Sequence, residues 1–159
     1  MDNKTKLAAR KILTEYLESN KLRKTPERYA ILDATYSIGG HFTLEELNAF
    51  LEKENFRVSR ATLYNTLKLF IKLRLAVIHR LLGGTYYEAG YTNENHCHQI
   101  CTICGKVTEV QIPQVISALE NAKLRRFQQE GFVLYIYGTC STCRAKTTRM
   151  KKKNNNNKT

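Results

Sequence analysis

The stretch NHCHQICTICGK, residues 95–106, holds two of the four histidines and three of the five cysteines of this chain. One Cys-x-x-Cys pair lies within it, and a second pair lies near the end of the chain. A single pair could be a redox motif, but two matched pairs can give a tetrahedral ion four sulfur ligands. We therefore predict a structural Zn²⁺ site formed by Cys101, Cys104, Cys140 and Cys143.

His96 and His98 lie two residues apart in a β-prone run. Both side chains should leave the same face of a strand, while Cys97 points to the other face. This arrangement keeps them away from the cysteine cluster and indicates a separate metal site, although two surface histidines would show the same spacing. Two histidines are an incomplete ligand set, and the candidates to complete it are His41, Glu88 and Glu109.

Composition and charge narrow the class of protein. The chain has 159 residues and a formal charge of +12, and it contains no apolar run long enough to cross a membrane. We expect a cytoplasmic protein, where clustered cysteines bind metal more often than they form disulfides. Residues 1–90 contain 15 Lys/Arg against 10 Asp/Glu, and the last 14 residues contain 6 against none. A cationic surface of this kind favours nucleic acid as a partner.

The first 90 residues are patterned as helices followed by a hairpin. Apolar residues recur at helical spacing in residues 6–22 and 27–38, and Thr43 with Glu46 forms a capping box for a third helix. Ser59 should cap a fourth helix, residues 60–75. Two β-prone runs around Gly83-Gly84 then predict a hairpin within residues 76–90. Helices followed by a hairpin indicate a winged-helix domain.

The second part, residues 91–145, predicts a smaller α/β unit. Residues 98–112 are strand-like with a turn, residues 113–131 are patterned as a helix ending at a glycine, and residues 132–138 are β-rich. A unit this small needs a stabilising cross-link or bound metal ion, which the four cysteines can supply. Residues 146–159 are polar, basic and of low complexity, so we expect a disordered tail. The predicted fold class is thus α+β, with domains 1–90 and 91–145.

The fourth helix carries a polar face opposite its apolar stripe. Cations on that face can neutralise phosphates, and polar side chains there can meet base edges in a major groove. A solvated helix face is the simpler interpretation, but the hairpin behind it and the nearby cations favour DNA. The predicted DNA-binding residues are Arg23, Arg28, Arg57, Arg60, Thr62, Tyr64 and Asn65.

Together these motifs resemble the ferric uptake regulator family over about residues 5–145. The likeness lies in RKTPER, GGHFTLEEL, SRATLYNTLKLF, YYE, HCHQICTICGKVTEV and LYIYGTCSTC, in family order. The resemblance implies a homodimeric, metal-dependent repressor that binds a palindromic operator in double-stranded DNA and is not an enzyme. It implies a regulatory metal site of His41, Glu88, His96, His98 and Glu109, and it supports the structural Zn²⁺ site.

Departures from the family pattern refine these expectations. Many members have a further metal site, but the matching positions here hold Asn95, Cys97, Ile116 and Phe132, so we expect it to be absent. Cys97 would then be a lone thiol, with a role as a haem or redox ligand left open. Zinc sensors tend to have a cysteine in the regulatory site, and peroxide sensors tend to have aspartates. By elimination we expect an Fe²⁺-responsive repressor of iron and haem uptake genes; haem-, zinc- or manganese-responsive members and, remotely, a zinc-dependent hydrolase are the alternatives.

Overall fold

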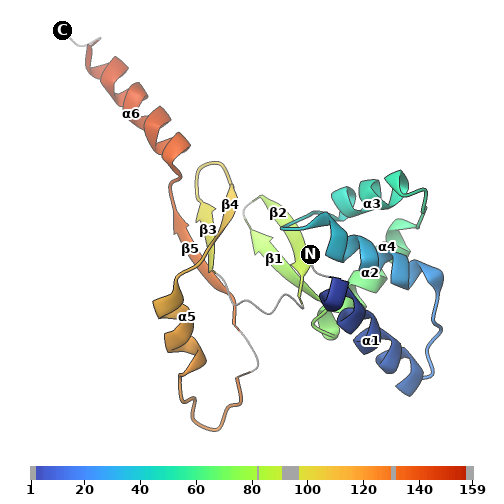
Figure 1. Cartoon of the computed structure of the whole chain (residues 1–159). Helices are drawn as coiled ribbons and strands as arrows, with labels where there is room; N and C mark the ends of the chain where they lie inside the picture. Colours follow the sequence, from blue (N-terminus) through green and yellow to red (C-terminus); the bar gives the residue numbers. More distant parts are fainter. Residues whose placement is uncertain (1–2, 82, 91–96, 130–131, 157–159) are drawn as a thin grey trace. The chain divides into compact units, whose positions relative to one another are not determined.

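The computed structural model describes residues 3–81, 83–90, 97–129 and 132–156, with side chains described as far as residue 150. The chain divides into two compact units, Met1–Asn93 and Glu94–Thr159, whose elements are labelled in Figure 1. Each unit mixes helices with a small sheet, as the α+β prediction requires. Within the described ranges, no helix combines the length and the apolar character that a membrane crossing would need.

Four helices and a hairpin form the first unit. Its helices are α1 (Asn3–Ser19), α2 (Pro26–Ile38), α3 (Leu44–Lys53) and α4 (Arg60–Lys72), and its strands are β1 (Ala76–Leu81) and β2 (Gly84–Ala89). The Thr43–Glu46 capping box and the Ser59 cap predicted from the sequence are present, whereas Thr25, before Pro26 of α2, makes no side-chain capping hydrogen bond. Thr43 accepts a hydrogen bond from the Glu46 backbone, and the Glu46 carboxylate accepts one from the Thr43 backbone. Ser59 caps α4 by accepting from the Thr62 backbone N–H.

The core of the first unit is formed by apolar side chains from all four helices and the hairpin. Leu13, Ile31, Leu47, Leu63 and Phe70 are fully buried, each on the apolar stripe of its helix. Burying these stripes against one another is what holds short helices in place, because isolated helices of this length are marginal in water. The packed core thereby presents α4 with its polar face to solvent.

The second unit is built on a three-stranded sheet. Its strands are β3 (Cys97–Cys101), β4 (Val107–Val110) and β5 (Leu134–Gly138), in the order β4-β3-β5. β3 pairs antiparallel with β4 and parallel with β5. Among its described side chains, the buried apolar ones are Cys97, Ile100, Cys101 and Cys143. Most of that small core is cysteine, which agrees with the expectation that the unit needs a cross-link or bound metal ion for stability.

The structure corrects two predicted elements of this unit. The predicted helix 113–131 ends much earlier, since α5 spans Pro113–Glu120. Leu124 and Phe127, which would have continued its apolar stripe, are exposed, and Arg126 has a positive φ of 56°. A positive φ is rare for a residue other than glycine and does not fit a helix. An apolar stripe without a partner surface is not enough to extend a helix.

The second correction concerns the predicted disordered tail. Helix α6 spans Ser141–Asn156, so residues 146–156 are helical rather than irregular. This segment contains no glycine or proline and is rich in lysine and arginine, which have good helix propensity. Low complexity predicts the absence of a buried face, but it does not exclude a solvated helix that starts from an anchored cysteine pair.

Candidate metal centres and nucleic-acid interface

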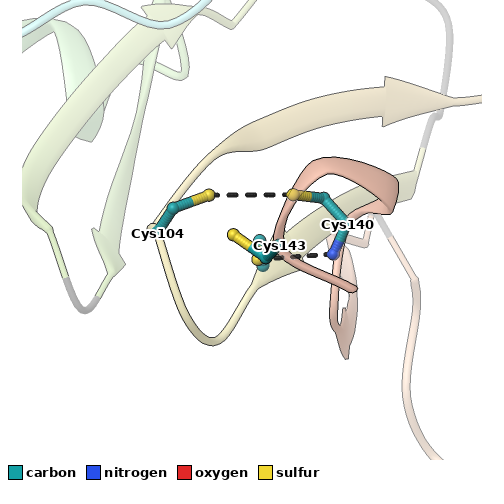
Figure 2. A group of neighbouring side chains, drawn as sticks. Cys104, Cys140 and Cys143 are labelled. Carbon is teal, nitrogen blue, oxygen red and sulfur yellow. Dashed lines mark hydrogen bonds between the residues drawn. The ribbon is translucent and has the colours of Figure 1, made fainter. Parts of the chain in front are cut away.

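The four predicted zinc ligands meet in the second unit. The sulfur atoms of Cys101, Cys104, Cys140 and Cys143 all lie within 4.8 Å of one another. Cys104 Sγ is 3.8 Å from Cys140 Sγ, and Figure 2 shows these side chains converging with Cys143. A tetrahedral ion with Zn–S bonds of about 2.3 Å requires S···S separations of about 3.8 Å. The cluster therefore fits a four-sulfur zinc site.

Local backbone structure brings the two pairs together. Cys101 ends β3, and the turn after it is closed by a hydrogen bond from the Gly105 N–H to the Cys101 carbonyl. Parallel pairing of β3 with β5 places Cys101 opposite Gly138, two residues before Cys140. The second pair then lies at the start of α6. Two pairs that are far apart in the sequence become neighbours because their strands are adjacent.

The thiols of the cluster have unequal acidities. The backbone N–H of Cys140 donates to Cys101 Sγ at 3.4 Å, and this hydrogen bond, with others from the Cys104 and Ile103 backbones, lowers the pKa of Cys101 from 9.0 to about 6. Hydrogen bonding to Cys104 and Cys140 raises the pKa of Cys143 to about 12. Four crowded sulfurs cannot all ionise easily, and a bound cation would offset that repulsion.

A second group of metal-ligating side chains lies in the first unit. Glu88 is almost buried, and its two carboxylate oxygens contact two imidazoles: Oε2 lies 3.2 Å from His41 Nε2, and Oε1 lies 3.2 Å from His79 Nε2. The His41 and His79 ring centroids are 5.0 Å apart. One donor atom from each of the three residues lies within 4.8 Å of the others. The arrangement offers two nitrogens and a carboxylate to a divalent cation.

β-Pairing fixes the positions of these three residues. Phe42 and Tyr87 form an antiparallel bridge, which sets His41 across from Glu88. On the other side of β2, Val77 pairs with Glu88, and His79 is two residues further along β1. Residues two apart on a strand share a face, so His79 projects on the same face as Glu88. Glu88 therefore lies between the two histidines.

His79 is absent from the ligand set predicted from the sequence. The signal that could have identified it is the alternation of side chains between the two faces of the hairpin. With Gly83-Gly84 as the two turn residues, His79 would pair directly with Glu88; in the structure Leu81 pairs with Gly84, which shifts the register by two residues. Both registers place His79 and Glu88 on one face. The β1 histidine was therefore within reach of sequence reasoning.

The other predicted regulatory ligands are His98 and Glu109, which belong to the second unit, and His96. His98 is buried, its ring lies 5.5 Å from that of Tyr135, and it pairs with Glu109 across the β3–β4 ladder. The side chain of Glu109 is exposed. His96 lies outside the described residues. The structure thus places His41 with Glu88 in one unit and His98 beside Glu109 in the other.

Cys97 is fully buried at the start of β3, paired with Val110 on one side and Leu134 on the other. A haem ligand must present its sulfur to the face of a large ring, and a thiol with no exposed surface cannot do so without rearrangement of the sheet. The haem-ligand role considered for Cys97 therefore gains no support from its position. Its place in the structure is that of a small apolar core residue.

The predicted DNA-binding residues lie on the surface of the first unit. Tyr64 and Asn65 are exposed on α4, and the Tyr64 side chain is 52% accessible. The Thr62 hydroxyl is 2.8 Å from the Ser59 hydroxyl, so it takes part in the helix cap. Arg60, at the first position of α4, donates to Glu45 at 2.7 Å. This end of α4 borders a groove of about 650 Å³ beside the β1–β2 turn.

Three further cations were predicted to contact DNA, and all lie in connections or at a helix start. Arg23 is exposed between α1 and α2, and its carbonyl accepts a hydrogen bond from the Arg28 guanidinium at 2.6 Å. Arg28 lies in the first turn of α2 and is partly buried. Arg57 is exposed in the connection before α4. These positions surround the start of two helices, where phosphate contacts are common.

Comparison with known proteins gives a consistent match. The model of the Ferric uptake regulator family matches residues 19–137. The peroxide-responsive repressor PerR of Staphylococcus saprophyticus is 30% identical over 132 residues, which cover 82% of this chain and 88% of the relative. PerR of Staphylococcus aureus is 32% identical over 126 residues, covering 79% and 84% of the two chains.

Solved structures agree with the fold. The Vibrio cholerae ferric uptake regulator has a TM-score of 0.58 and 28% identity, covering 79% of this chain and 98% of its own. The Pseudomonas aeruginosa ferric uptake regulator, solved with manganese, has a TM-score of 0.65 and 25% identity, covering 80% and 98%. The Helicobacter pylori ferric uptake regulator has a TM-score of 0.68 at 21% identity, covering 87% and 93%.

Proposed function

The chain belongs to the ferric uptake regulator family, and from this premise we propose that it is an Fe²⁺-responsive repressor of iron and haem uptake genes. At the coarser level it is a metal-responsive transcriptional regulator of a family whose members bind DNA and act as dimers. Members of this family are regulators rather than enzymes, and membership gives the hydrolase alternative no support. We propose that the protein works in the cytoplasm, as regulators of this family do.

The observation that carries the proposal is the distribution of metal-ligating residues over two units. His41 and Glu88 are in contact within the first unit, and His98 is buried beside Glu109 in the second. We propose that these residues, with His96, hold one regulatory ion between residues 1–90, which read DNA, and residues 91–145, which dimerise. A bound divalent cation supplies the positive charge that these nitrogens and carboxylates share.

The chain's own residues would convert metal binding into DNA binding. His41 and Glu88 are anchored through the Phe42–Tyr87 bridge to β2 and to the start of α3, so a constraint on their positions is transmitted to the winged-helix core. An arrangement that satisfies donors from both units is bound better than one that does not, and only this difference shifts the population. In a dimer it would set two α4 helices at a fixed separation on a palindromic operator.

Within that frame, the polar face of α4 would read the operator. Tyr64 and Asn65 are free of the helix cap and exposed, so they can reach base edges in a major groove. Arg57 and Arg60 would contact phosphates near the start of α4, and Arg23 and Arg28 would do so near the start of α2. The four cysteines would hold Zn²⁺ permanently, giving the second unit the stability that its small core lacks.

The donor set is compatible with iron. Imidazole nitrogens and carboxylate oxygens suit Fe²⁺ and Mn²⁺, and no cysteine accompanies His41, His79 and Glu88 among the described residues of the first unit. Sulfur ligands would shift preference toward zinc. Because a site of this kind also accepts Zn²⁺ and Co²⁺, the metal used in the cell depends on availability as well as on geometry.

The test is a DNA-binding titration on full-length protein with its zinc intact, at one fixed salt concentration, because phosphate contacts make affinity depend steeply on salt. Fe²⁺ without oxygen, Mn²⁺ or Zn²⁺ would be added in turn, to wild type and to His41→Ala. We expect Fe²⁺ to raise operator affinity at least about 10-fold for wild type, and His41→Ala to lose that response. An unchanged metal response in His41→Ala would refute the regulatory site, and a response to Zn²⁺ alone would refute iron sensing.

A second candidate function is a response to peroxide, because both curated relatives named above are peroxide-responsive repressors. The experiment compares the Fe²⁺-loaded and Mn²⁺-loaded complexes with DNA after brief exposure to hydrogen peroxide. A peroxide sensor would release DNA only in the Fe²⁺ form, since Fe²⁺ reacts with peroxide and Mn²⁺ does not do so readily. Equal retention of DNA by both forms would leave the iron-responsive function as the answer.

A further inference from the structure

We infer that His79 is a metal ligand, and that His41, His79 and Glu88 form a three-donor metal site built entirely within the first unit. The inference rests on the proposed function, because it concerns the same regulatory ion. It changes the ligand set, however, because His79 is added and three donors then come from the first unit. We refer to these three residues as the N-terminal triad.

The spacing of the donor atoms supports a metal site. His41 Nε2 and His79 Nε2 each lie 3.2 Å from an oxygen of Glu88, and one donor atom from each of the three residues lies within 4.8 Å of the others. A tetrahedral ion with bonds of about 2.0–2.1 Å needs neighbouring donors about 3.3 Å apart. Both histidine–carboxylate separations match that spacing, and both lie within the first unit.

The surroundings of the triad also favour a cation. His79 is fully buried, and the side chains of His41 and Glu88 are only 12% and 11% exposed. A buried carboxylate is costly unless positive charge or hydrogen-bond donors compensate it. Two imidazoles that contact opposite oxygens of one carboxylate are well placed for a divalent ion to join them. Such a two-histidine, one-carboxylate set leaves further coordination positions open, as in many Fe²⁺ sites.

The backbone holds the triad in place before any ion arrives. Glu88 belongs to β2, His79 belongs to the paired strand β1, and His41 precedes the bridge residue Phe42. All three positions are therefore determined by β-pairing within one unit. It follows that the first unit should retain measurable metal affinity when the histidines of the second unit are removed.

The test is a Co²⁺ titration of full-length, zinc-containing protein, followed by the visible absorbance of bound Co²⁺. Zinc content and circular dichroism verify folding. Replacing His79 with Gln should lower Co²⁺ affinity at least about 100-fold, because even outer-shell partners of metal ligands contribute about 10–100-fold. Arg80→Gln, an exposed neighbour on the same strand, is the matched control and should bind Co²⁺ as wild type does. His79→Gln binding within about threefold of wild type would overturn the inference.

A second variant gives a positive signal. His79→Cys places a thiolate at the same position, and sulfur ligation of Co²⁺ adds an intense charge-transfer band in the near ultraviolet that nitrogen ligation lacks. Appearance of that band, measured against wild type, supports ligation from position 79, and its absence from a folded, Co²⁺-loaded variant overturns it. Cys97 is present in both proteins, so it cannot account for a difference between them.

A third measurement leaves His79 unchanged, so that it remains decisive if the buried position tolerates no substitution. In His96→Ala/His98→Ala, the histidines that remain are His41 and His79. Proton NMR of this variant with Co²⁺ should show two strongly shifted imidazole N–H resonances, one from each ligand. A single shifted resonance, or none, would overturn the inference.

These outcomes are separable from failure of the proposed function. If wild type binds Co²⁺ through His79 but DNA binding ignores metal, the regulatory proposal fails and the N-terminal triad stands. If His79→Gln binds Co²⁺ normally and retains metal-dependent DNA binding, the triad fails and the regulatory proposal stands.

Discussion

Phe42 and Tyr87 exchange two backbone hydrogen bonds, with N···O distances of 2.9 and 2.7 Å, and their stacked rings have centroids 6.2 Å apart. This bridge joins the segment before α3 to the second strand of the hairpin. It also sets His41 across from Glu88, whose contact is at the centre of the proposed regulatory site. The same backbone pairing therefore organises both the winged-helix core and the metal-ligating residues.

The first prediction follows from this bridge. If opening the bridge separates His41 from Glu88, metal binding must oppose that opening. Amide hydrogen exchange at Phe42 and Tyr87 should slow by about 100-fold at a metal concentration 100 times the dissociation constant, because the ligand binds only the closed form. Mn²⁺ is a suitable ion, with exchange followed by mass spectrometry. Exchange at these two amides that is insensitive to metal would show that the bridge and the metal site are independent.

The second prediction compares two cysteines of the second unit. Cys104→Ser removes one sulfur from the cluster, so zinc content after dialysis should fall from about one ion per chain to near zero, and the thermal stability of the unit should fall with it. Cys97→Ser is the matched control because Cys97 belongs to the same unit but not to the cluster. Its zinc content should not change. Equal zinc loss in both variants would contradict a four-cysteine site.

The third prediction concerns pH. Because the pKa of Cys101 is lowered to about 6, its thiol is already ionised at neutral pH in the zinc-free fold, whereas that of Cys143, raised to about 12, is protonated. Zinc must displace the proton from Cys143 throughout the working range, but from Cys101 only below about pH 6. The plot of log zinc affinity against pH should therefore steepen by about one proton below that pH.

The same shift affects the stability of the zinc-free fold. A depressed folded-state pKa contributes stability that is complete above the usual thiol value of 9.0 and is lost as pH falls through about 6.

The predicted change in the slope of log zinc affinity would be measured by competition titrations with a chelator between pH 5 and 8. A constant slope across pH 6 would contradict the assignment of a depressed pKa to Cys101.

The fourth prediction concerns the Arg60–Glu45 contact at the start of α4. Both side chains are well exposed, so the ion pair contributes at most about 1 kcal/mol to stability. Glu45→Gln should leave the thermal midpoint nearly unchanged but raise operator affinity a few-fold, because it removes a negative charge near the phosphates and releases Arg60. Arg60→Gln should weaken DNA binding and reduce the salt slope by about 0.9 per lost phosphate contact. Weaker DNA binding by Glu45→Gln would contradict this orientation.

Much of the first unit could be predicted from the sequence because its signals are local. The Thr43–Glu46 capping box and the Ser59 cap depend on residues within a few positions of one another. Apolar spacing predicts that Leu63, Leu67, Phe70 and Ile71 face inward on the fourth helix. The first three are buried, and Ile71 is partly buried. Local hydrogen bonds of helix caps and periodic burial of apolar residues can be recognised directly from a sequence.

The second unit was harder to predict because its elements depend on neighbours far along the chain. The apolar pattern after Glu120 continued the helical spacing, but Leu124 and Phe127 have no surface to pack against and the helix ends. In the other direction, residues with no apolar face form the end of α6, where they continue a helix that begins at the second cysteine pair. Periodicity reports which faces could be buried, not whether a partner surface exists.

By itself the sequence determined the ligand chemistry of this protein: two Cys-x-x-Cys pairs, a His-x-His motif and a cationic helix, together with the helices and hairpin that carry them. The tertiary structure alone decided how distant donors meet. Parallel pairing of β3 with β5 brings Cys140 to Cys101, and the pairing of β1, β2 and the Phe42 segment brings His79 and His41 to Glu88. Strand pairing is non-local, so a metal site assembled across strands depends on registers that only the folded chain specifies.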